Sequence, residues 1–257
     1  MALLEVRHLS RRFGGNLAVN NVSFDIRQGE LLALIGPNGA GKSTTFNIIN
    51  GQLPATSGSV TFDGQPLLGL GSRRIAHLGV GRTFQVAATF ASFTVLENVQ
   101  MALVAHRHRL RAFWRPLGAF YRADALNLLD RVGMADQADT PCSELAYGDV
   151  KRVELAMSLA GDPRLLLMDE PTAGMAPAER HALVALVKNL VRQRGLAVLF
   201  TEHSMDVVFA FADRVVVLAR GEVIAEGSVE QVRAHPRVQE VYFGSGATVG
   251  VPEGAPT

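Results

Sequence analysis

The segment Gly36–Thr44, which reads GPNGAGKST, constrains the fold of this chain more than any other feature of the sequence. It fits the pattern G-x-x-x-x-G-K-[ST], follows the apolar run Leu31–Ile35 and opens a stretch of helical character, Thr44–Asn50. Glycines in such a loop let the backbone wrap around a phosphate with its N–H groups pointing inward, and the following helix adds the positive end of its dipole. The sequence therefore predicts a strand, a phosphate-binding loop and a helix in succession.

This loop is predicted to bind a nucleotide together with a magnesium ion. The Lys42 ammonium would reach the β- and γ-phosphates, and the Ser43 hydroxyl would coordinate Mg²⁺. A glycine-rich turn before a helix is the alternative, but average composition makes a chance match to the whole pattern a rare event. The residues expected to contact the nucleotide are Gly36, Pro37, Asn38, Gly39, Ala40, Gly41, Lys42, Ser43 and Thr44.

Continuous apolar runs of strand length recur along the chain and indicate a parallel sheet. Such runs are buried on both faces, which is typical of a parallel sheet flanked by helices. The four runs are Leu31–Ile35, Leu165–Met168, Leu196–Phe200 and Val215–Ala219. Three shorter strands, separated by turns at Gly14-Gly15 and Gly64, are expected to form an antiparallel edge sheet. They are Val6–Leu9, Val22–Ile26 and Val60–Asp63.

Strand signals fade between about Gln85 and Ala160, where helical patterns take over. Thr94–Glu97 has the spacing of a capping box before a helix, and further helices are expected over 123–132 and 149–160. We therefore predict a nucleotide-binding core over residues 1–84 and 161–243, interrupted by a helical subdomain over 85–160. Residues 244–257 are rich in Gly and Pro and are predicted to be a disordered tail.

Composition and charge exclude several classes of protein. With 48% hydrophobic and 19% charged residues, the chain can bury a substantial core and is not disordered as a whole. The 25 basic and 24 acidic residues leave a net charge of +1, which argues against nucleic acid as a partner. Cys142 is the only cysteine, and the sequence has no run of about 18 apolar residues that could cross a membrane. We expect a soluble, cytosolic protein.

Two carboxylates follow the apolar run Leu165–Met168. Asp169 is placed at the carboxyl end of a buried strand, where it can hold Mg²⁺ directly or through water. Glu170 follows at once and could deprotonate an attacking water. Alone this pattern is a common strand end, but the phosphate-binding loop in the same chain favours the catalytic interpretation.

A third element, Leu145–Asp149 (LAYGD), leads into a helical pattern 20 residues before Asp169. In this order and spacing it resembles the signature motif of the ATP-binding cassette (ABC) ATPases. Other motifs of that family fall in the same order: Phe13 at the adenine-stacking position, Gln85 in the Q-loop, Thr172–Pro177 in the D-loop and His203 as the switch histidine. The resemblance covers residues 3–243.

The resemblance implies both a fold and a set of site residues. The fold is of the α/β class, a P-loop NTPase core with an antiparallel edge sheet and an inserted α-helical subdomain. Catalytic roles are implied for Lys42, Glu170 and His203, and metal binding for Ser43, Gln85 and Asp169. Beyond the phosphate loop, nucleotide contacts are implied for Phe13, Gln85, Tyr147 and Gly148, the last two toward the γ-phosphate bound by an opposing cassette.

Within this family the chain is most similar to the ATPases of branched-chain amino acid importers and their urea-importer relatives. The similarity is carried by Gly81–Gln85 (GRTFQ), the long insert after His106, Pro171–Met175 (PTAGM) and Val241–Gly244 (VYFG). It implies a peripheral subunit on the cytoplasmic face of the inner or plasma membrane, which uses ATP and Mg²⁺. Its implied partners are permease subunits, a second cassette (a paralogous chain or a homodimer mate) and, indirectly, an extracytoplasmic solute-binding protein.

Three substitutions depart from the usual family pattern and put the rate of hydrolysis in question. Ala146 removes the usual signature serine, Asp149 places a carboxylate near a polyphosphate, and Ala176 replaces an acidic or amide residue of the D-loop.

Other functions remain as alternatives. An ATPase of a lipid or lipopolysaccharide exporter shares this architecture, whereas a soluble ABC ATPase or a small-molecule phosphotransferase fits less of the motif set. The segment His106–Phe120 combines arginines with aromatic residues, so it either faces a membrane or permease or forms a solvated helix packed on the subdomain.

Overall fold

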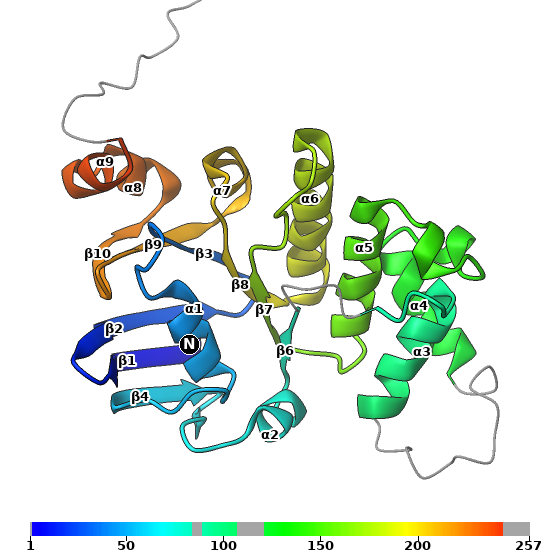
Figure 1. Ribbon diagram of the computed structural model, residues 1–257, viewed down its shortest axis with the longest axis horizontal. Coiled ribbons are helices and arrows are strands. Elements are labelled where there is room, and N and C mark those ends of the chain that lie inside the picture. Colours follow the sequence, from blue (N-terminus) through cyan, green and yellow to red (C-terminus); the bar gives the residue numbers. More distant parts are fainter. Residues whose placement is uncertain (1, 84–88, 107–120, 244–257) are drawn as a thin grey trace, which may run out of the picture.

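The computed structural model describes residues 2–83, 89–106 and 121–243 and consists of two β-sheets with helices packed around them (Figure 1). Gln85, most of the arginine-rich insert and the predicted tail 244–257 lie outside the described residues. Within the described part, the α/β class and the separate antiparallel sheet are as predicted.

The larger sheet has the strand order β10-β9-β3-β8-β7-β6, and its strands from β9 to β6 are parallel. Only β10 runs antiparallel, paired with β9. Every residue of β3, β7 and β8 is buried, which explains their continuous apolar sequences. The strands are β3 (Leu31–Ile35), β6 (Val80–Arg82), β7 (Leu165–Asp169), β8 (Ala197–Thr201), β9 (Arg214–Ala219) and β10 (Glu222–Gly227).

The smaller sheet is antiparallel, with the order β2-β1-β4-β5. Its strands are β1 (Ala2–Phe13), β2 (Asn16–Arg27), β4 (Ser57–Phe62) and β5 (Gln65–Pro66). The prediction of short strands was wrong for β1 and β2, which each have 12 residues. Buried and exposed positions mix along both strands and their pairing contains irregular steps, so their apolar centres marked only part of each strand.

Helices cover both faces of the parallel sheet and create two hydrophobic cores. Alternate residues of β3 serve different cores: Leu32 and Leu34 pack with α1 and the antiparallel sheet, whereas Leu31, Ala33 and Ile35 pack with the helices on the other face. The helices are α1 (Lys42–Ile49), α2 (Ser72–His77), α3 (Val95–His106), α4 (Arg122–Arg131), α5 (Tyr147–Ser158), α6 (Pro177–Arg194), α7 (Met205–Phe211), α8 (Val229–Ala234) and α9 (Pro236–Phe243).

Helices α3, α4 and α5 lie together at one end of the molecule, beyond the edge strand β6 (Figure 1). The capping box before α3 has formed: the Glu97 backbone N–H donates to Thr94 Oγ1 at 3.2 Å, and the Thr94 N–H donates to Glu97 Oε2 at 2.9 Å. The division into a core and a helical subdomain at residues 84/85 and 160/161 stays a prediction.

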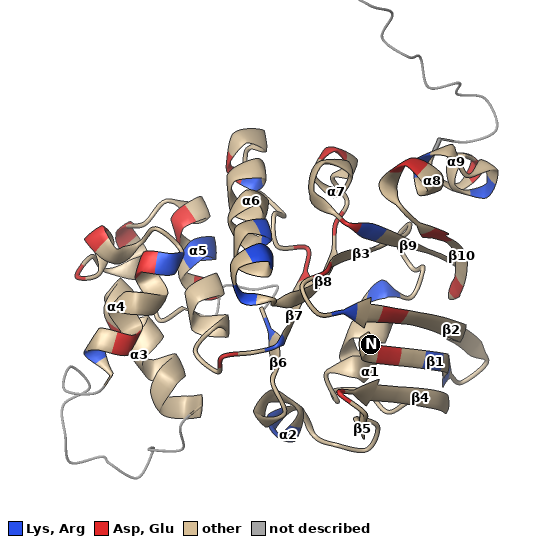
Figure 2. Ribbon diagram, turned by 180° about the vertical axis from the view of Figure 1, so that it is seen from behind, with Lys and Arg blue, Asp and Glu red and all other residues tan. Residues whose placement is uncertain are grey.

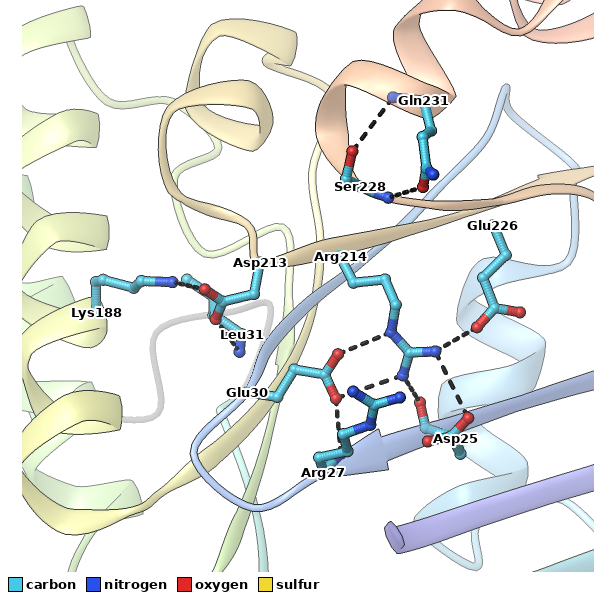
Figure 3. A network of polar contacts seen from close by, with 10 residues as sticks. All are labelled: Asp25, Arg27, Glu30, Leu31, Lys188, Asp213, Arg214, Glu226, Ser228 and Gln231. Atoms are coloured by element: carbon cyan, nitrogen blue, oxygen red, sulfur yellow. Dashed lines mark hydrogen bonds and ion pairs between the residues drawn. The ribbon is translucent and has the colours of Figure 1, made fainter. Parts of the chain in front are cut away.

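An ionic network around Arg214 joins the two sheets (Figure 3). The Arg214 guanidinium at the start of β9 donates to Glu30 Oε1 at 2.7 Å, to Glu226 and to the backbone oxygen of Asp25 on β2. Glu30 also accepts the backbone N–H of Arg27 at 2.7 Å. Because Asp25 belongs to the antiparallel sheet and Arg214 to the parallel one, this network fixes one sheet against the other.

Charged residues of both signs are distributed over the sheets and helices (Figure 2). This distribution agrees with the net charge of +1. Among the described residues, no helix combines the length and the apolar character that crossing a membrane requires.

Candidate active site

The phosphate-binding loop connects the buried end of β3 to the start of α1, as the sequence predicts. Gly41 has φ = +102°, and a Cβ at this position would come within 2.6 Å of the Ala18 backbone oxygen, so both the conformation and the space require glycine. Pro37, Asn38 and Gly39 are exposed at the tip of the loop, and Ser43 is exposed in the first turn of α1. These residues are accessible to a phosphate at the N-terminus of the helix.

The Lys42 side chain is buried under this loop. Its Nζ atom donates hydrogen bonds to the backbone oxygens of Gly36 at 2.7 Å and Pro37 at 3.2 Å. Burial lowers the pKa of the Lys42 ammonium, while the negative charges of Glu170 and Asp169 act in the opposite direction. The lysine therefore lies within electrostatic reach of both candidate carboxylates.

Asp169 ends β7, and its carboxylate is held from two sides. Its Oδ1 accepts a hydrogen bond from Thr201 Oγ1 at 2.7 Å, and its Oδ2 lies 3.6 Å from Nη2 of Arg82. Burial lowers the pKa of the Arg82 guanidinium, and the Asp169 charge opposes this. The parallel pairing of β6, β7 and β8 brings these three strand-end residues together.

Glu170 and His203, predicted as catalytic, are in contact. His203 Nε2 lies 2.8 Å from Glu170 Oε1, and both side chains are partly exposed. Glu170 adopts φ = +50°, unusual for a residue other than glycine, and its backbone N–H donates to Thr201 Oγ1 at 3.0 Å. Such a backbone conformation is common at functional sites, and here the neighbouring strand β8 fixes it.

A buried carboxylate, Glu202, organises the segments around this pair. Its Oε1 accepts the Thr172 backbone N–H at 3.0 Å and the Thr172 hydroxyl at 2.6 Å, and its Oε2 accepts the His203 N–H at 3.1 Å. The glutamate is only 3% exposed. It links the predicted D-loop to the predicted switch histidine. No motif in the sequence predicts this role, although Glu202 directly precedes His203.

The predicted signature residues lie on the first turn of α5 and contact the D-loop of the same chain. The Tyr147 hydroxyl donates to the Ala173 backbone oxygen at 3.2 Å. Gly148 is buried, and a Cβ added there would come within 3.3 Å of Glu179 Oε1 on α6. The γ-phosphate contact implied for Tyr147 and Gly148 concerns another chain and stays a prediction.

Of the two remaining predicted residues, Phe13 lies at the edge of the site and Gln85 is outside the described residues. Phe13 ends β1 and is 43% exposed, with the Arg11 guanidinium carbon 4.5 Å from its ring centroid. Its predicted role, stacking on adenine, requires such an exposed ring. The metal and nucleotide contacts predicted for Gln85 cannot be followed, since that residue lies outside the described part.

Comparison with known proteins identifies the family. The family model for ABC transporters matches residues 19–173, more than half of the chain, and the model for branched-chain amino acid ATP-binding cassette transporters matches residues 222–248. This chain belongs to the ABC transporter family. The family resemblance predicted from its motifs is thereby confirmed.

Individual relatives agree with this assignment along almost the whole chain. The high-affinity branched-chain amino acid transport ATP-binding protein LivG of Salmonella typhimurium is 40% identical over 252 residues, covering 94% of this chain and 98% of LivG. BraF of Pseudomonas aeruginosa, which carries the same description, is 38% identical over 251 residues, covering 94% of this chain and 98% of BraF.

Solved structures confirm the predicted fold class. The ADP conformation of an ATP-binding cassette of an ABC transporter has a TM-score of 0.87 and 31% identity, covering 95% of this chain and 99% of that one. A nucleotide-free cassette has a TM-score of 0.85 at 31% identity, covering 95% of this chain and 100% of that one. The chain is thus an ABC ATPase with the cassette fold, and the predicted ATPase activity is confirmed at the level of the family.

The residues of this ABC ATPase also fit a magnesium ion. Mg²⁺ prefers hard oxygen ligands, usually one or two protein side chains together with water and substrate phosphates. The Ser43 hydroxyl on α1 and the Asp169 carboxylate on β7 are oxygen donors of this kind, and α1 packs against β7. Glu170 and Lys42 add one charge of each sign beside them.

Proposed function

We propose that this chain is the ATP-hydrolysing subunit that energises import of branched-chain amino acids or similar small polar solutes. The observation that carries this proposal is the similarity to LivG and BraF over nearly their whole length. A protein named for the import of a different solute has a similar degree of sequence identity to this chain. The phosphonates import ATP-binding protein PhnC 2 of Synechococcus is 36% identical over 245 residues, covering 94% of this chain and 90% of that protein.

In this proposal the phosphate loop and Lys42 bind the β- and γ-phosphates of ATP, and Phe13 stacks on the adenine. Ser43, Asp169 and Gln85 would hold Mg²⁺, which would neutralise phosphate charge when bound. Glu170 accepts a proton from the attacking water, and His203 donates a hydrogen bond to the γ-phosphate. The contact between His203 and Glu170 supports a joint role, since it brings a proton acceptor and a phosphate-binding group to one place.

The proposal includes a second cassette, either a paralogous chain or a second copy. Tyr147 and Gly148 of each chain contact the γ-phosphate held by the other chain, so that ATP closes the pair and hydrolysis opens it. The exposed ring of Tyr147, at 48% exposure, supports a role at an interface.

The membrane partners are permease subunits, with an extracytoplasmic solute-binding protein acting through them. A groove with a volume of about 580 Å³ supports this part of the proposal. It lies between β6 and the helices α2, α3 and α5, and apolar residues such as Val80, Phe90, Met101 and Met157 line it. A permease helix docked there would place the subunit on the cytoplasmic face of the membrane. Nucleic acid is not among the proposed partners.

Uptake measured with the reconstituted transporter tests the proposal. Permease subunits that copurify with this chain are placed in proteoliposomes with ATP inside and the solute-binding protein outside, and radiolabelled leucine and a phosphonate are offered in separate experiments. We expect ATP-dependent leucine uptake. Lys42→Ala should abolish it, since this variant lacks the positive charge that would contact the β- and γ-phosphates. Phosphonate uptake without leucine uptake would contradict the proposed solute, and outward movement of either solute would contradict import.

A further inference from the structure

Arg82, the last residue of β6, places a positive charge beside the candidate metal carboxylate. Its Nη2 atom lies 3.6 Å from Asp169 Oδ2, and the two side chains are 14% and 4% exposed. Its Nη1 atom donates to Asn47 Oδ1 at 2.7 Å and to Gln52 Oε1 at 2.8 Å. The guanidinium is therefore shared between one carboxylate and two neutral amides.

These contacts fix the guanidinium independently of Asp169. The backbone of Arg82 pairs with Leu167 on β7, two residues before Asp169, so the two side chains come from adjacent strands of a parallel sheet. Asn47 belongs to α1, the helix that the phosphate loop opens. Because the two amide hydrogen bonds are shorter than the distance to Asp169, the charge stays in place whatever Asp169 binds.

A positive charge fixed beside Asp169 should weaken the binding of a metal cation to that carboxylate. Charges that are mostly withdrawn from water interact more strongly than charges at the surface, since the effective dielectric constant is lower. A positive charge beside Asp169 stabilises the carboxylate without metal and repels a divalent cation that binds there. Without Arg82 the carboxylate would keep its hydrogen bond from Thr201 to the other oxygen, so we expect the lost repulsion to have a larger effect than the lost order.

We propose that Arg82 is a fixed counter-cation of Asp169 that weakens the binding of Mg²⁺ at this carboxylate. The inference rests on the proposed function in one respect, the role of Asp169 as a metal ligand. Arg82 acts through Asp169 and is a positioning residue, not a catalytic one. Because Arg82 weakens the binding of Mg²⁺, the metal would leave the site more readily together with the product nucleotide.

Calorimetry on the full-length chain tests this role with the non-hydrolysable analogue AMP-PNP, titrated in EDTA and in excess Mg²⁺. The dissociation constant in EDTA divided by that in Mg²⁺ gives a ratio that rises as the protein favours the metal-bound nucleotide more strongly. In Arg82→Gln we expect the dissociation constant in EDTA to change less than about twofold, because the phosphate loop is intact. We expect binding in Mg²⁺ to tighten by about fivefold or more, because a nearby repulsive charge is gone.

Two further variants separate charge from structure. Arg82→Lys keeps the charge without the guanidinium fork, so its ratio should stay near that of the unmodified chain. Arg164→Gln removes a matched arginine that pairs with Asp63 on the surface, at 2.6 Å, and should leave the ratio unchanged. Should Arg82→Gln fail to fold, Arg82→Met provides the same neutral comparison.

An unchanged or reduced ratio in the neutral variants would overturn the proposal, since Arg82 would then serve the fold alone. A rise in Arg82→Lys equal to that in Arg82→Gln would overturn it as well, because the effect would come from lost hydrogen bonds. If the unmodified chain bound AMP-PNP neither in EDTA nor in excess Mg²⁺, that result would instead refute the proposed function.

Discussion

His203 Nε2 lies 2.8 Å from Glu170 Oε1, so the two residues that follow the adjacent strands β7 and β8 meet through their side chains. The backbone prepares this contact: the Glu170 N–H is bonded to Thr201, and the His203 N–H is bonded to Glu202. A carboxylate held by an imidazole at a strand end is well placed to take a proton from a water.

Replacing Glu170 by glutamine should separate nucleotide binding from hydrolysis. Glu170→Gln keeps the size of the side chain and removes the base, so ATP affinity should remain within about twofold while hydrolysis falls about 100-fold or more. A dimer that persists in ATP should accumulate, detectable by size-exclusion chromatography. Unchanged turnover of this variant in the assembled transporter would exclude Glu170 as the base.

Removing the imidazole should also affect hydrolysis more than binding. His203→Ala leaves Glu170 without its partner and removes the proposed γ-phosphate contact, so we expect hydrolysis to fall about 10- to 100-fold. ATP affinity measured by calorimetry should change much less. A collapse of affinity with a normal rate per bound nucleotide would show that His203 has a structural role.

Motifs and apolar runs predicted those parts of the site that are contiguous in sequence. The phosphate loop, β3 and the strand ending at Asp169 each leave a local pattern, and the structure has them where that pattern lies. Arg82 and Glu202 leave none, because their roles depend on partners 87 and 30 residues away along the chain. Arg82 lies within the GRTFQ segment and Glu202 directly precedes His203, but only the pairing of β6, β7 and β8 gives either residue a role.

Glu202 should be important for stability as well as for the order of the D-loop. Glu202 is almost fully buried and accepts three hydrogen bonds, from the Thr172 N–H, the Thr172 hydroxyl and the His203 N–H. In Glu202→Gln the amide NH₂ group would face at least one of these donors and could not accept its hydrogen bond. We expect a loss of about 1–3 kcal/mol in the free energy of unfolding. Urea denaturation measures it, with Glu240→Gln on the exposed side of α9 as control. Equal midpoints for the two variants would contradict the assignment.

The Arg214 network should stabilise the contact between the two sheets. Arg214→Met keeps the apolar stem but leaves Glu30 and Glu226 without their ionic partner in a partly buried place. Breaking such a pair from one side should cost about 3 kcal/mol. Thermal unfolding of this variant and of the exposed Arg237→Met gives the comparison. A loss no larger than that of the control would show that the network is dispensable.

Gly148 provides a test of the proposed γ-phosphate contact between two cassettes, but the structure requires a second variant for it. In Gly148→Asp the new carboxylate would meet Glu179 of the same chain, because a Cβ at this position already comes within 3.3 Å of Glu179 Oε1. A loss of activity in this variant alone would therefore have two explanations: repulsion within the chain, or repulsion of the γ-phosphate held by the partner.

The double variant Gly148→Asp with Glu179→Gln separates them. If Gly148 contacts a nucleotide across the dimer, both variants should bind ATP almost normally but fail to dimerise in ATP and to hydrolyse it. If the conflict is internal, removing the Glu179 charge should restore thermal stability and activity together. ATP binding, thermal unfolding and ATP-dependent dimerisation, measured on one preparation of each variant, decide between the two. Restored dimerisation in the double variant would refute the contact in trans, because the aspartate would still be there to repel the phosphate.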